Sequence, residues 1–597
     1  MTDGPFLGVA RSALGRAWAL RPADPGWVQA HAARLSAPEL VGRILAGRGA
    51  PPELGEVAIR PTLKALMPDP SSLRDMDKAV AAILDAAAAG ARIIIFADYD
   101  VDGATSGALL LRWFRAVGAD AAVHVPDRIQ DGYGPTPAAM RRLQAEGADL
   151  VITVDCGANA HAALEEAARI GLEVVVFDHH LMAGPPPPAL AVVNPNRQDC
   201  NAGQGTLTAA GVVFLALAAL NRAVRAGELP GVETPPDLMP WLDLAALGTV
   251  CDVAPLTGFN RALVRQGLRA LGDGANIGLS ALATIAKAQP PFGVYHAGFV
   301  FGPRLNAGGR LGDSSLAVRL LSTQDPAEAE ELAGVLDGLN AERRAVEAAV
   351  LEEAQALIAR GAAGPPDGPV LVVGKPGWHP GVIGIVAGRL KDIVRRPTVV
   401  IGSADDDGAD AKGSGRSLPG VDLGSAVSAA AAAGVLTAGG GHAMAAGMSL
   451  SFDRIDALRA FLTDRLLDDV DRATRGDRLL VDGLISLAAA TPETLDWIEG
   501  AGPYGAGWPE PVFALSDVRV TWASVAGGAH VRFTVADASG ANLRGIAFRA
   551  LGTPLGDLLT SARAAPIHLA VRLKRDTWNG RNGVDLEAVD AAPAGDR

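Results

Sequence analysis

One stretch, residues 93–107, limits the possible folds of this chain more than any other. It begins with five apolar residues, Ile-Ile-Ile-Phe-Ala, then presents Asp98, Asp100 and Asp102, and passes into a helix-like segment at 108–117. A continuous apolar run that leads into a short loop and a helix is typical of a βα unit in a parallel sheet. Ligand sites in such sheets lie at the carboxyl ends of the strands, where these acids stand.

The three acids occupy alternate positions, which in an extended chain places them on one side. Like charges that lie close together are costly unless a cation lies among them, and oxygen ligands suit divalent cations. The alternative is a solvated, aspartate-rich turn that ends at Asp102-Gly103. The residues of this stretch alone leave both interpretations open.

The same pattern recurs downstream, which favours the first interpretation. Apolar strands separated by helix-like segments are predicted at 93–97, 122–125, 150–154 and 174–177. This βαβ organisation indicates a parallel sheet. The third strand ends in Asp155 and the fourth in Asp178-His179-His180. Singly, Asp155 could be a helix N-cap and the histidines ordinary loop residues. Because parallel strands end at one edge of the sheet, together they predict a carboxylate and imidazole cluster with two-metal character.

Another acid, Asp252, follows a predicted apolar helix at 242–249. It is either a further ligand or an acid of a C-terminal turn. Beyond it, Asp325-Pro326 predicts the start of a long amphipathic helix that runs to Arg360. A second α/β domain is expected from about residue 369, with glycine-dense loops at 412–416 and 439–447 that could approach an anion or only make tight turns.

Composition excludes several classes of protein. Three cysteines without paired spacing argue against a disulfide framework and for a reducing compartment. The chain shows no signal-peptide pattern and no uninterrupted apolar run of membrane-spanning length, so we expect a cytoplasmic protein without a membrane anchor. The net charge of -13 requires any nucleic-acid binding to use local basic patches or metals.

From about residue 475 the strands are short, which predicts a small antiparallel barrel. Basic residues cluster there with one aromatic side chain, at Arg572, Lys574, Arg575 and Trp578. Such a combination fits single-strand binding, and an ordinary charged hairpin is the alternative.

In these motifs the chain resembles the DHH phosphoesterase superfamily and, within it, the RecJ family of single-strand-specific 5′-to-3′ exonucleases. The resemblance extends over roughly residues 75–590 and rests on the stretches 98–107, 154–157, 178–180, 247–253, 302–313, 377–384, 414–417 and 439–447. It implies an α/β multidomain protein with an N-terminal segment (1–74), a parallel-sheet DHH catalytic domain (75–315), a connecting helix (316–364), a DHH-associated substrate-binding domain (365–472) and an OB-like nucleic-acid-binding barrel (473–597).

The resemblance implies hydrolysis of single-stranded DNA to mononucleotides with two divalent cations, Mn²⁺ or, second, Mg²⁺. It implies that Asp100 and Asp102 hold different metals and that Asp155 bridges them. His179 and Asp252 would complete one site, and Asp98 would serve the other directly or through water. His180 is expected to donate to the scissile phosphate and Asp178 to orient the histidines. Many superfamily members carry a histidine at the position of Phe96, so one metal has fewer protein ligands here.

Further groups are needed to bind the DNA. Arg304, Arg310, Ser414 and Arg416 are expected to hold the terminal phosphate, in motifs that also contain Asn306 and His442. His442 would contact a phosphate or cap a turn, and Arg128 and Tyr133 would line the entry. The resemblance also implies a monomer in DNA repair and recombination, beside a helicase and a single-strand-binding protein.

Three other readings compete with this one. The first is a phosphodiesterase for short oligonucleotides or cyclic dinucleotides, and the second is a scaffold that has lost its metals. The third is a type II inorganic pyrophosphatase, which has no need of a barrel. The long connector, the C-terminal extension and the complete ligand set argue against them.

Overall fold

The computed structural model describes residues 4–127, 132, 134–182, 184–365, 368–403, 411–561, 565–576 and 583–595. The chain divides into two compact units. The first unit comprises residues 1–302, 317–330 and 478–597, and the second comprises 303–316 and 331–477. Among the described helices, none combines the length and the apolar character needed to cross a membrane.

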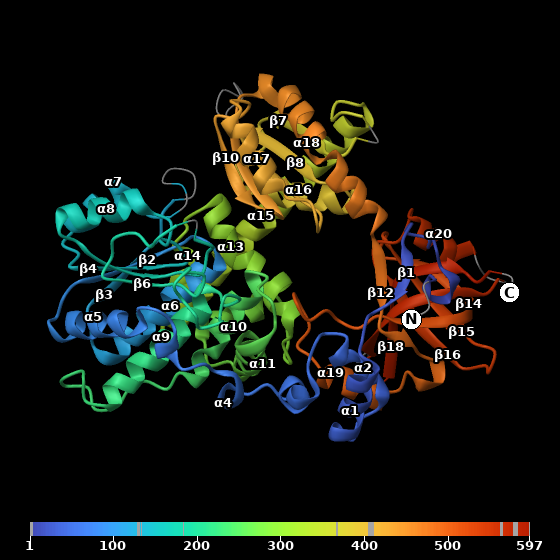
Figure 1. Ribbon diagram of the computed structural model, residues 1–597, viewed down its shortest axis with the longest axis horizontal. Coiled ribbons are helices and arrows are strands. Elements are labelled where there is room, and N and C mark those ends of the chain that lie inside the picture. Colours follow the sequence, from blue (N-terminus) through green and yellow to red (C-terminus); the bar gives the residue numbers. More distant parts are fainter. Residues whose placement is uncertain are drawn as a thin grey trace. The chain divides into compact units, whose positions relative to one another are not determined.

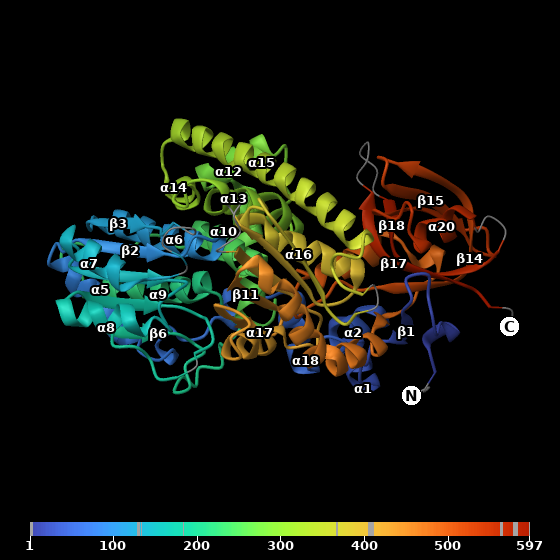
Figure 2. The same cartoon turned by 90° about the horizontal axis from the view of Figure 1, so that it is seen from above.

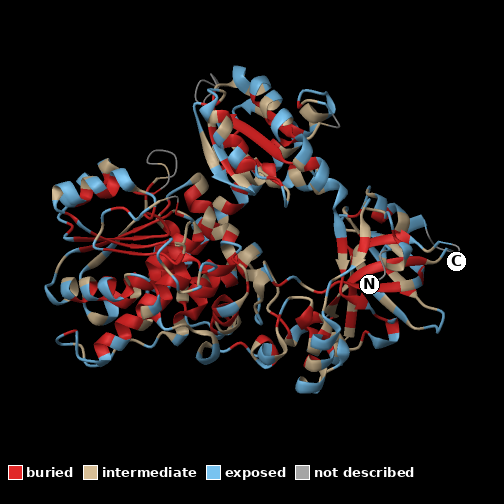
Figure 3. Ribbon diagram, in the orientation of Figure 1, coloured by how far each residue is buried: buried red, intermediate tan, exposed pale blue. Residues whose placement is uncertain are grey.

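The first unit contains the predicted parallel sheet (Figure 1). Strands β2 and β4 are buried along their whole length, which explains their continuous apolar sequence (Figure 3). The last strand was not predicted, because its three residues are too few to show a pattern. The order, with every pairing parallel, is β3 (Ala121–His124), β2 (Ile93–Ala97), β4 (Leu150–Val154), β5 (Glu173–Phe177) and β6 (Ala191–Val193).

Helices cover both faces of this sheet (Figure 1). Helices α7 (Pro137–Ala145) and α8 (His161–Ile170) pack on the face that carries Ile94 and Phe96. The other face is covered by α5 (Met76–Ala88), α6 (Val101–Val117) and α9 (Ala209–Arg225). Two further helices, α10 (Leu242–Cys251) and α11 (Gly258–Asp273), pack against each other, and α10 also packs against α6.

Helix α6 begins at Val101, earlier than the predicted residue 108. Asp100 caps it, because its carboxylate accepts hydrogen bonds from the backbone N–H groups of Asp102 (2.8 Å) and Gly103 (3.1 Å). The argument from alternate spacing in an extended chain was therefore wrong. Asp98 follows a strand, Asp100 is an N-cap, and Asp102 lies in the first helical turn.

The second unit is built on a mixed sheet in the order β10, β11, β9, β8, β7. Residues 412–416 and 439–447, which were expected as loops, lie mostly in strands β9 (Ala411–Arg416), β10 (Ala438–His442) and β11 (Ala445–Leu450). Their glycines permit close packing, since a Cβ on Gly415 would lie 2.6 Å from Leu423. The long helix α15 (Pro326–Ala359) is confirmed and runs unbroken in Figure 2.

The C-terminal part of the first unit is the predicted barrel. It closes because β17 pairs with both β14 and β18, and the β16–β18 pairing is parallel. Strand β14 has an irregularity in its pairing with β17 between Leu515 and Val518. The barrel strands are β14 (Phe513–Ala526), β15 (His530–Ala536), β16 (Asn542–Ala547), β17 (Ile567–Asp576) and β18 (Gly583–Pro593).

The N-terminal segment packs against this barrel. Strand β1 (Ala17–Leu20) pairs in parallel with β12 (Arg478–Val481), which had been expected to belong to the barrel. The fully buried carboxylate of Asp590 accepts hydrogen bonds from Ser12 (2.7 Å) and Arg16 (3.1 Å). These contacts give residues 12–20 a fixed place that local sequence patterns do not reveal.

Candidate metal centre

The carboxyl ends of three neighbouring strands each carry an acid. Asp98 follows β2, Asp155 follows β4 and Asp178 follows β5. The backbone N–H of each acid donates to the carbonyl of the last residue of the next strand, at Val154 (3.2 Å), Phe177 (3.0 Å) and Val193 (3.1 Å). The three acids are therefore held in a row along one edge of the sheet, where ligands bind in such folds.

Ligand-type atoms from this edge form three overlapping groups, and within each group the atoms lie no more than 4.8 Å apart. Asp155 and His179 each belong to two of the groups. The Nε2 atom of His179 lies 3.2 Å from Asp155 Oδ1, 3.7 Å from Asp102 Oδ2 and 3.8 Å from Asp252 Oδ2. The groups are Asp98, Asp100 and Asp155; Asp102, His179 and Asp252; and Asp155, His179 and His180.

Asp102 is positioned by the start of another helix. Its carboxylate is buried and accepts hydrogen bonds from the backbone N–H groups of Ala209 (2.7 Å) and Ala210 (3.0 Å) in the first turn of α9. A helix N-terminus stabilises a negative charge through these N–H groups and its dipole. The contact joins residues more than 100 positions apart in the sequence.

Asp178 and His180 form a hydrogen-bonded pair. The Oδ1 atom of Asp178 accepts from the backbone N–H of His179 (2.7 Å) and lies 2.8 Å from His180 Nδ1. Burial raises the pKa of Asp178, but the hydrogen bonds and the charge of His180 outweigh it and lower the pKa to about 2. Burial lowers the pKa of His180, but Asp178 and nearby carboxylates raise it to about 9.

The protonation preferences of the other ligand-type side chains suit a site for divalent cations. Burial and neighbouring carboxylates raise the pKa of Asp102 and Asp155 well above the usual range, and that of Asp252 to about 7. Burial and the nearby His180 lower the pKa of His179 to about 4, so its imidazole is neutral at pH 7, as a metal ligand must be. Its Nε2 atom is buried and has no hydrogen-bond partner among the described residues. A cation among these groups would offset the repulsion between the carboxylates and would give His179 Nε2 a partner.

Gly248 of α10 packs directly on the carboxylate of Asp102. A Cβ at this position would lie 2.6 Å from Asp102 Oδ1, 2.6 Å from Thr105 Oγ1 and 2.7 Å from Ala210 Cβ. We expect Gly248→Ala to displace the carboxylate, to weaken Mn²⁺ binding about tenfold, and to destabilise the fold by about 1–3 kcal/mol. Calorimetric titration with Mn²⁺ and thermal unfolding measure the two effects.

Gly272 of α11 is the matched control. Its nearest neighbour for an added Cβ is Pro290, at 3.9 Å. Gly272→Ala should leave Mn²⁺ binding unchanged and stabilise the helix by about 0.5–1 kcal/mol. Equal Mn²⁺ affinity in the Gly248→Ala and Gly272→Ala variants would contradict the crowding argument.

Phe96, at the position for which the resemblance implied a histidine in many superfamily members, is a core residue. It is fully buried and lies 5.3 Å from the ring of His124. It belongs to the hydrophobic cluster under α7 and α8. Asp98 joins Asp100 and Asp155 in one ligand group without a residue from this position.

In the second unit, three of the residues expected to hold a phosphate gather around the first turns of α16 (Pro380–Val394). Arg310 donates to the carbonyl of Gly381 (3.0 Å), and Arg416 donates to the hydroxyl of Ser414 (3.0 Å). A Cβ on Gly384 would lie 2.9 Å from Ser414 Oγ and 3.0 Å from Arg416 Nη2. The helix start, two guanidinium groups and a hydroxyl are a suitable combination for an anion.

The other residues expected to contact the DNA have the following settings. Arg304 donates to Asp337 of α15 (2.8 Å). Asn306 is half-buried on α13 (Gly302–Leu311), and His442 is exposed at the end of β10. Arg128, Tyr133 and Trp578 lie outside the described residues.

The basic residues of the barrel are paired with acids. Lys574 lies 2.7 Å from Glu510, Arg572 lies 2.8 Å from Glu587, and Arg575 contacts both Asp496 (2.6 Å) and Glu499 (2.7 Å). Neutralised side chains attract a polyanion weakly. These pairs favour the alternative interpretation, an ordinary charged hairpin.

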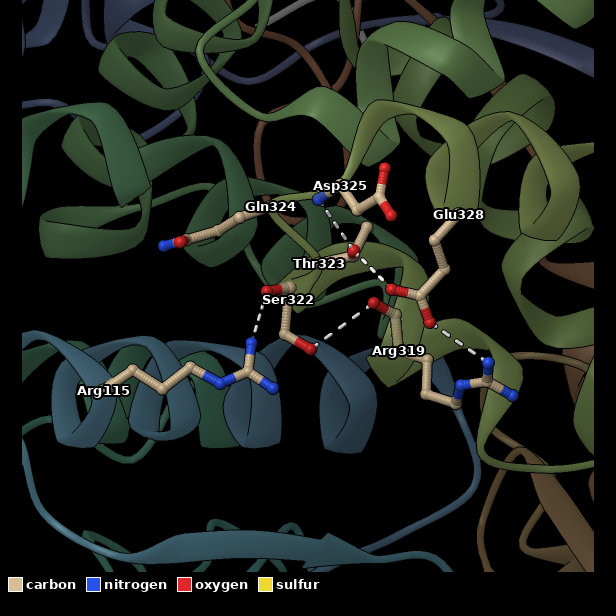
Figure 4. Close-up of a pocket in the computed structure, with 7 residues that line it drawn as sticks. All are labelled: Arg115, Arg319, Ser322, Thr323, Gln324, Asp325 and Glu328. Atoms are coloured by element: carbon tan, nitrogen blue, oxygen red, sulfur yellow. Dashed lines mark hydrogen bonds and ion pairs between the residues drawn. The ribbon is translucent and has the colours of Figure 1, made fainter.

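A pocket of about 510 Å³ lies between the end of α6, the end of α14 (Leu316–Ser322) and the start of α15 (Figure 4). Its arginines are engaged, since Arg319 pairs with Glu328 (3.1 Å) and Arg115 donates to the carbonyl of Ser322 (2.7 Å). Arg115 is separated from Asp102 by about 20 Å along α6. The pocket is therefore distinct from the acidic cluster.

Two residues at the cluster had no role assigned from the sequence. Asn194 and Asn196 follow β6, and their side chains donate to the backbone of the two histidines. Asn194 stands directly after an apolar strand, as Asp98, Asp155 and Asp178 do. That shared position was the signal that could have identified it.

Comparison with known proteins covers most of the chain. Residues 92–249 match the DHH family N-terminal domain, residues 367–468 the DHHA1 domain and residues 481–590 the RecJ OB domain. The single-stranded-DNA-specific exonuclease RecJ of Salmonella typhimurium is 36% identical over 93% of this chain and 96% of its own length. The Escherichia coli protein of the same name is 36% identical over 86% of this chain and 89% of its own.

Solved structures agree with this. The crystal structure of RecJ from Thermus thermophilus in complex with Mn²⁺ matches with a TM-score of 0.78 and 32% identity, over 96% of this chain and 79% of that one. A second structure of the Thermus thermophilus protein contains Mg²⁺ and matches with a TM-score of 0.73. The ligand groups at the sheet edge suit the same two ions. The chain therefore belongs to the RecJ family of single-stranded-DNA-specific exonucleases, which are metal-dependent phosphoesterases of the DHH type.

Proposed function

We propose that this chain hydrolyses single-stranded DNA from its 5′ end to mononucleotides, with two divalent cations at the edge of the parallel sheet. The observation that carries the proposal is the convergence of two groups of three ligands, one of which shares Asp155 and the other His179 with a third group. Asp98, Asp100 and Asp155 would hold one ion. Asp102, His179 and Asp252 would hold the other, with Asp155 between them.

When bound, two such cations polarise the phosphate and lower the pKa of a water molecule to make it a nucleophile. His180 would donate a hydrogen bond to a phosphate oxygen of the scissile bond. Asp178 would hold one ring nitrogen of His180, at 2.8 Å, and so leave the other for the substrate. Asp100 would anchor the start of α6 as well as a metal, because its Oδ1 atom caps that helix.

The 5′ polarity would come from the group around α16. We assign the terminal 5′ phosphate to Arg310, Ser414, Arg416 and the backbone N–H groups at the start of that helix. Two guanidinium groups recognise a terminal phosphate more strongly than an internal one, which carries less charge. Arg304, Asn306 and His442, with Arg128 and Tyr133, remain proposed contacts along the strand.

The test uses the full chain, Mn²⁺ and a 3′-labelled single strand of a few tens of nucleotides, with either a 5′ phosphate or a 5′ hydroxyl. We expect progressive shortening from the 5′ end, faster with the phosphate. Excess EDTA should abolish cleavage and added Mn²⁺ should restore it, because the proposed hydrolysis needs the cations to activate the water and polarise the phosphate.

A duplex and a dinucleotide are the matched substrates. Cleavage of the dinucleotide alone would indicate a phosphodiesterase for short substrates. Binding of the single strand without cleavage in Mn²⁺ or Mg²⁺ would indicate a scaffold. Shortening from the 3′ end would contradict the proposed polarity.

An exonuclease confined to single strands depends on other proteins to expose them. We therefore propose that a helicase and a single-strand-binding protein act beside it in DNA repair and recombination. We also propose that the chain acts as a monomer, which light scattering at several protein concentrations tests.

A further inference from the structure

We propose that Asn194 and Asn196 are positioning residues that fix the backbone of His179 and His180 and thereby set the affinity of the metal centre. We call these two side chains the asparagine clamp. The inference rests on the proposed function, because it gives the clamp a task at the same centre. Neither asparagine belongs to a ligand group, so the groups alone assign these two residues no role.

Asn194 is fully buried directly after β6. Its Nδ2 atom donates to the carbonyl of His180 (2.9 Å), and its Oδ1 atom accepts from the backbone N–H of Asn196 (2.7 Å). Both ends of the amide are therefore used, one to hold the histidine and one to hold the second asparagine. A buried amide with both ends bonded has one orientation.

Asn196 holds the neighbouring histidine. Its Nδ2 atom donates to the carbonyl of His179 (2.5 Å) and to the carbonyl of Gly205 (3.2 Å). The clamp thus grips two consecutive carbonyls, while Asp178 binds the two N–H groups of the same dipeptide. Every backbone polar group of His179-His180 has a side-chain partner in this arrangement.

The clamp is itself anchored to the body of the unit. Arg197 is buried and donates to Asp75 (2.5 Å) beside α5, to the carbonyl of Val192 (2.6 Å) in β6 and to Asp199 (2.8 Å). The contacts with Asp75 and Val192 tie the loop that carries the asparagines to the start of α5 and to β6, whereas the contact with Asp199 lies within that loop. Movement of the histidine backbone would therefore require movement of β6 and α5.

The fixed backbone matters because the ring of His179 must meet several carboxylates at once. Its Nε2 atom lies between 3.2 and 3.8 Å from Asp155, Asp102 and Asp252. Metal ligands must be held within about 0.5 Å of their working positions by the residues behind them. Loss of such a supporting hydrogen bond typically weakens metal binding about 10- to 100-fold.

The experiment measures Mn²⁺ binding to the full chain by isothermal titration calorimetry, and thermal unfolding in EDTA, for Asn196→Ala and Asn194→Ala. We expect Asn196→Ala to raise the Kd for Mn²⁺ about 10-fold or more. Cleavage of single-stranded DNA should recover at high Mn²⁺, since the ligands remain. Asn196 is half-buried, so this variant decides the question if the buried Asn194→Ala variant does not fold.

Asn276→Ala is the matched control. Asn276 is also buried, accepts from a backbone N–H (Leu279, 3.0 Å) and donates to a backbone carbonyl (Leu321, 3.0 Å), but touches none of the ligands. It should bind Mn²⁺ as the wild type does, at a comparable loss of stability. Equal Kd values for Asn196→Ala and Asn276→Ala would overturn the positioning role. A wild-type chain that binds no Mn²⁺ would overturn the proposed function with it.

Discussion

Replacing Asp155 with asparagine is expected to lower the rate of single-strand cleavage by more than about 100-fold. This loss exceeds the loss of about 10- to 100-fold that is typical when a residue that only supports a metal ligand is removed. Asp155 belongs to the group proposed to hold one ion and lies 3.2 Å from His179 Nε2 of the other group, so its loss is expected to impair both proposed metal positions. Asparagine keeps the size of the side chain but lacks the charge that a divalent cation requires. The rate is measured with saturating Mn²⁺ and a 5′-phosphorylated single strand.

The same substitution should stabilise the metal-free protein. Burial and the surrounding carboxylates raise the pKa of Asp155, so its charged form is costly at neutral pH and the neutral amide relieves that cost. Thermal unfolding in EDTA should therefore give a higher Tm for Asp155→Asn. A lower Tm would mean that the activity loss reflects damage to the fold.

Asp149 provides the control for this experiment. It immediately precedes β4, whereas Asp155 immediately follows it, so the two acids lie at opposite ends of one strand. Asp149 accepts a hydrogen bond from the backbone of Arg92 (2.8 Å) at an exposed position. Asp149→Asn should keep nearly full activity. Comparable activity of the two variants would refute the assignment of the metal centre to the carboxyl ends of the strands.

Replacing Arg261 with methionine is expected to destabilise the first unit by about 3–5 kcal/mol, the largest stability effect that we predict. Arg261 is buried in α11, and its guanidinium lies 4.2 Å from the ring of Trp508. Methionine fills a similar volume but donates no hydrogen bond. The guanidinium donates to four backbone carbonyls, at Ala58 (2.9 Å), Ala501 (2.6 Å), Gly502 (2.8 Å) and Pro503 (2.9 Å).

The acceptors of Arg261 come from the N-terminal segment and from the chain that leads into the barrel. One side chain therefore joins three parts of the sequence, and without it four carbonyls lose a donor, of which Ala501 still accepts from Trp508 and Gly502 from Arg265. A large drop in Tm in EDTA is the expected readout. Arg269→Met, at an exposed position of the same helix, should change stability by less than about 0.5 kcal/mol. A similar Tm for both variants would contradict the structural role.

The amino-acid sequence alone determined the parallel sheet and the place of its ligands. The apolar runs before Asp98, Asp155 and Asp178 have the length and continuity of strands buried on both faces, and chain direction puts their ends on one edge. The long α15 helix and the barrel were likewise readable from periodicity. These features depend on local patterns, which a linear sequence displays directly.

Only the tertiary structure decided how the ligands are held. Asp102 meets the start of α9, Asn194 and Asn196 grip the histidines, and Gly248 leaves room for a carboxylate. The same holds for the ion pairs of Arg572, Lys574 and Arg575 with acids of other segments. Each of these depends on which distant segments pack together. Hydrogen bonds and ion pairs between such segments leave no period or spacing in the sequence, because their geometry exists only once the core has formed.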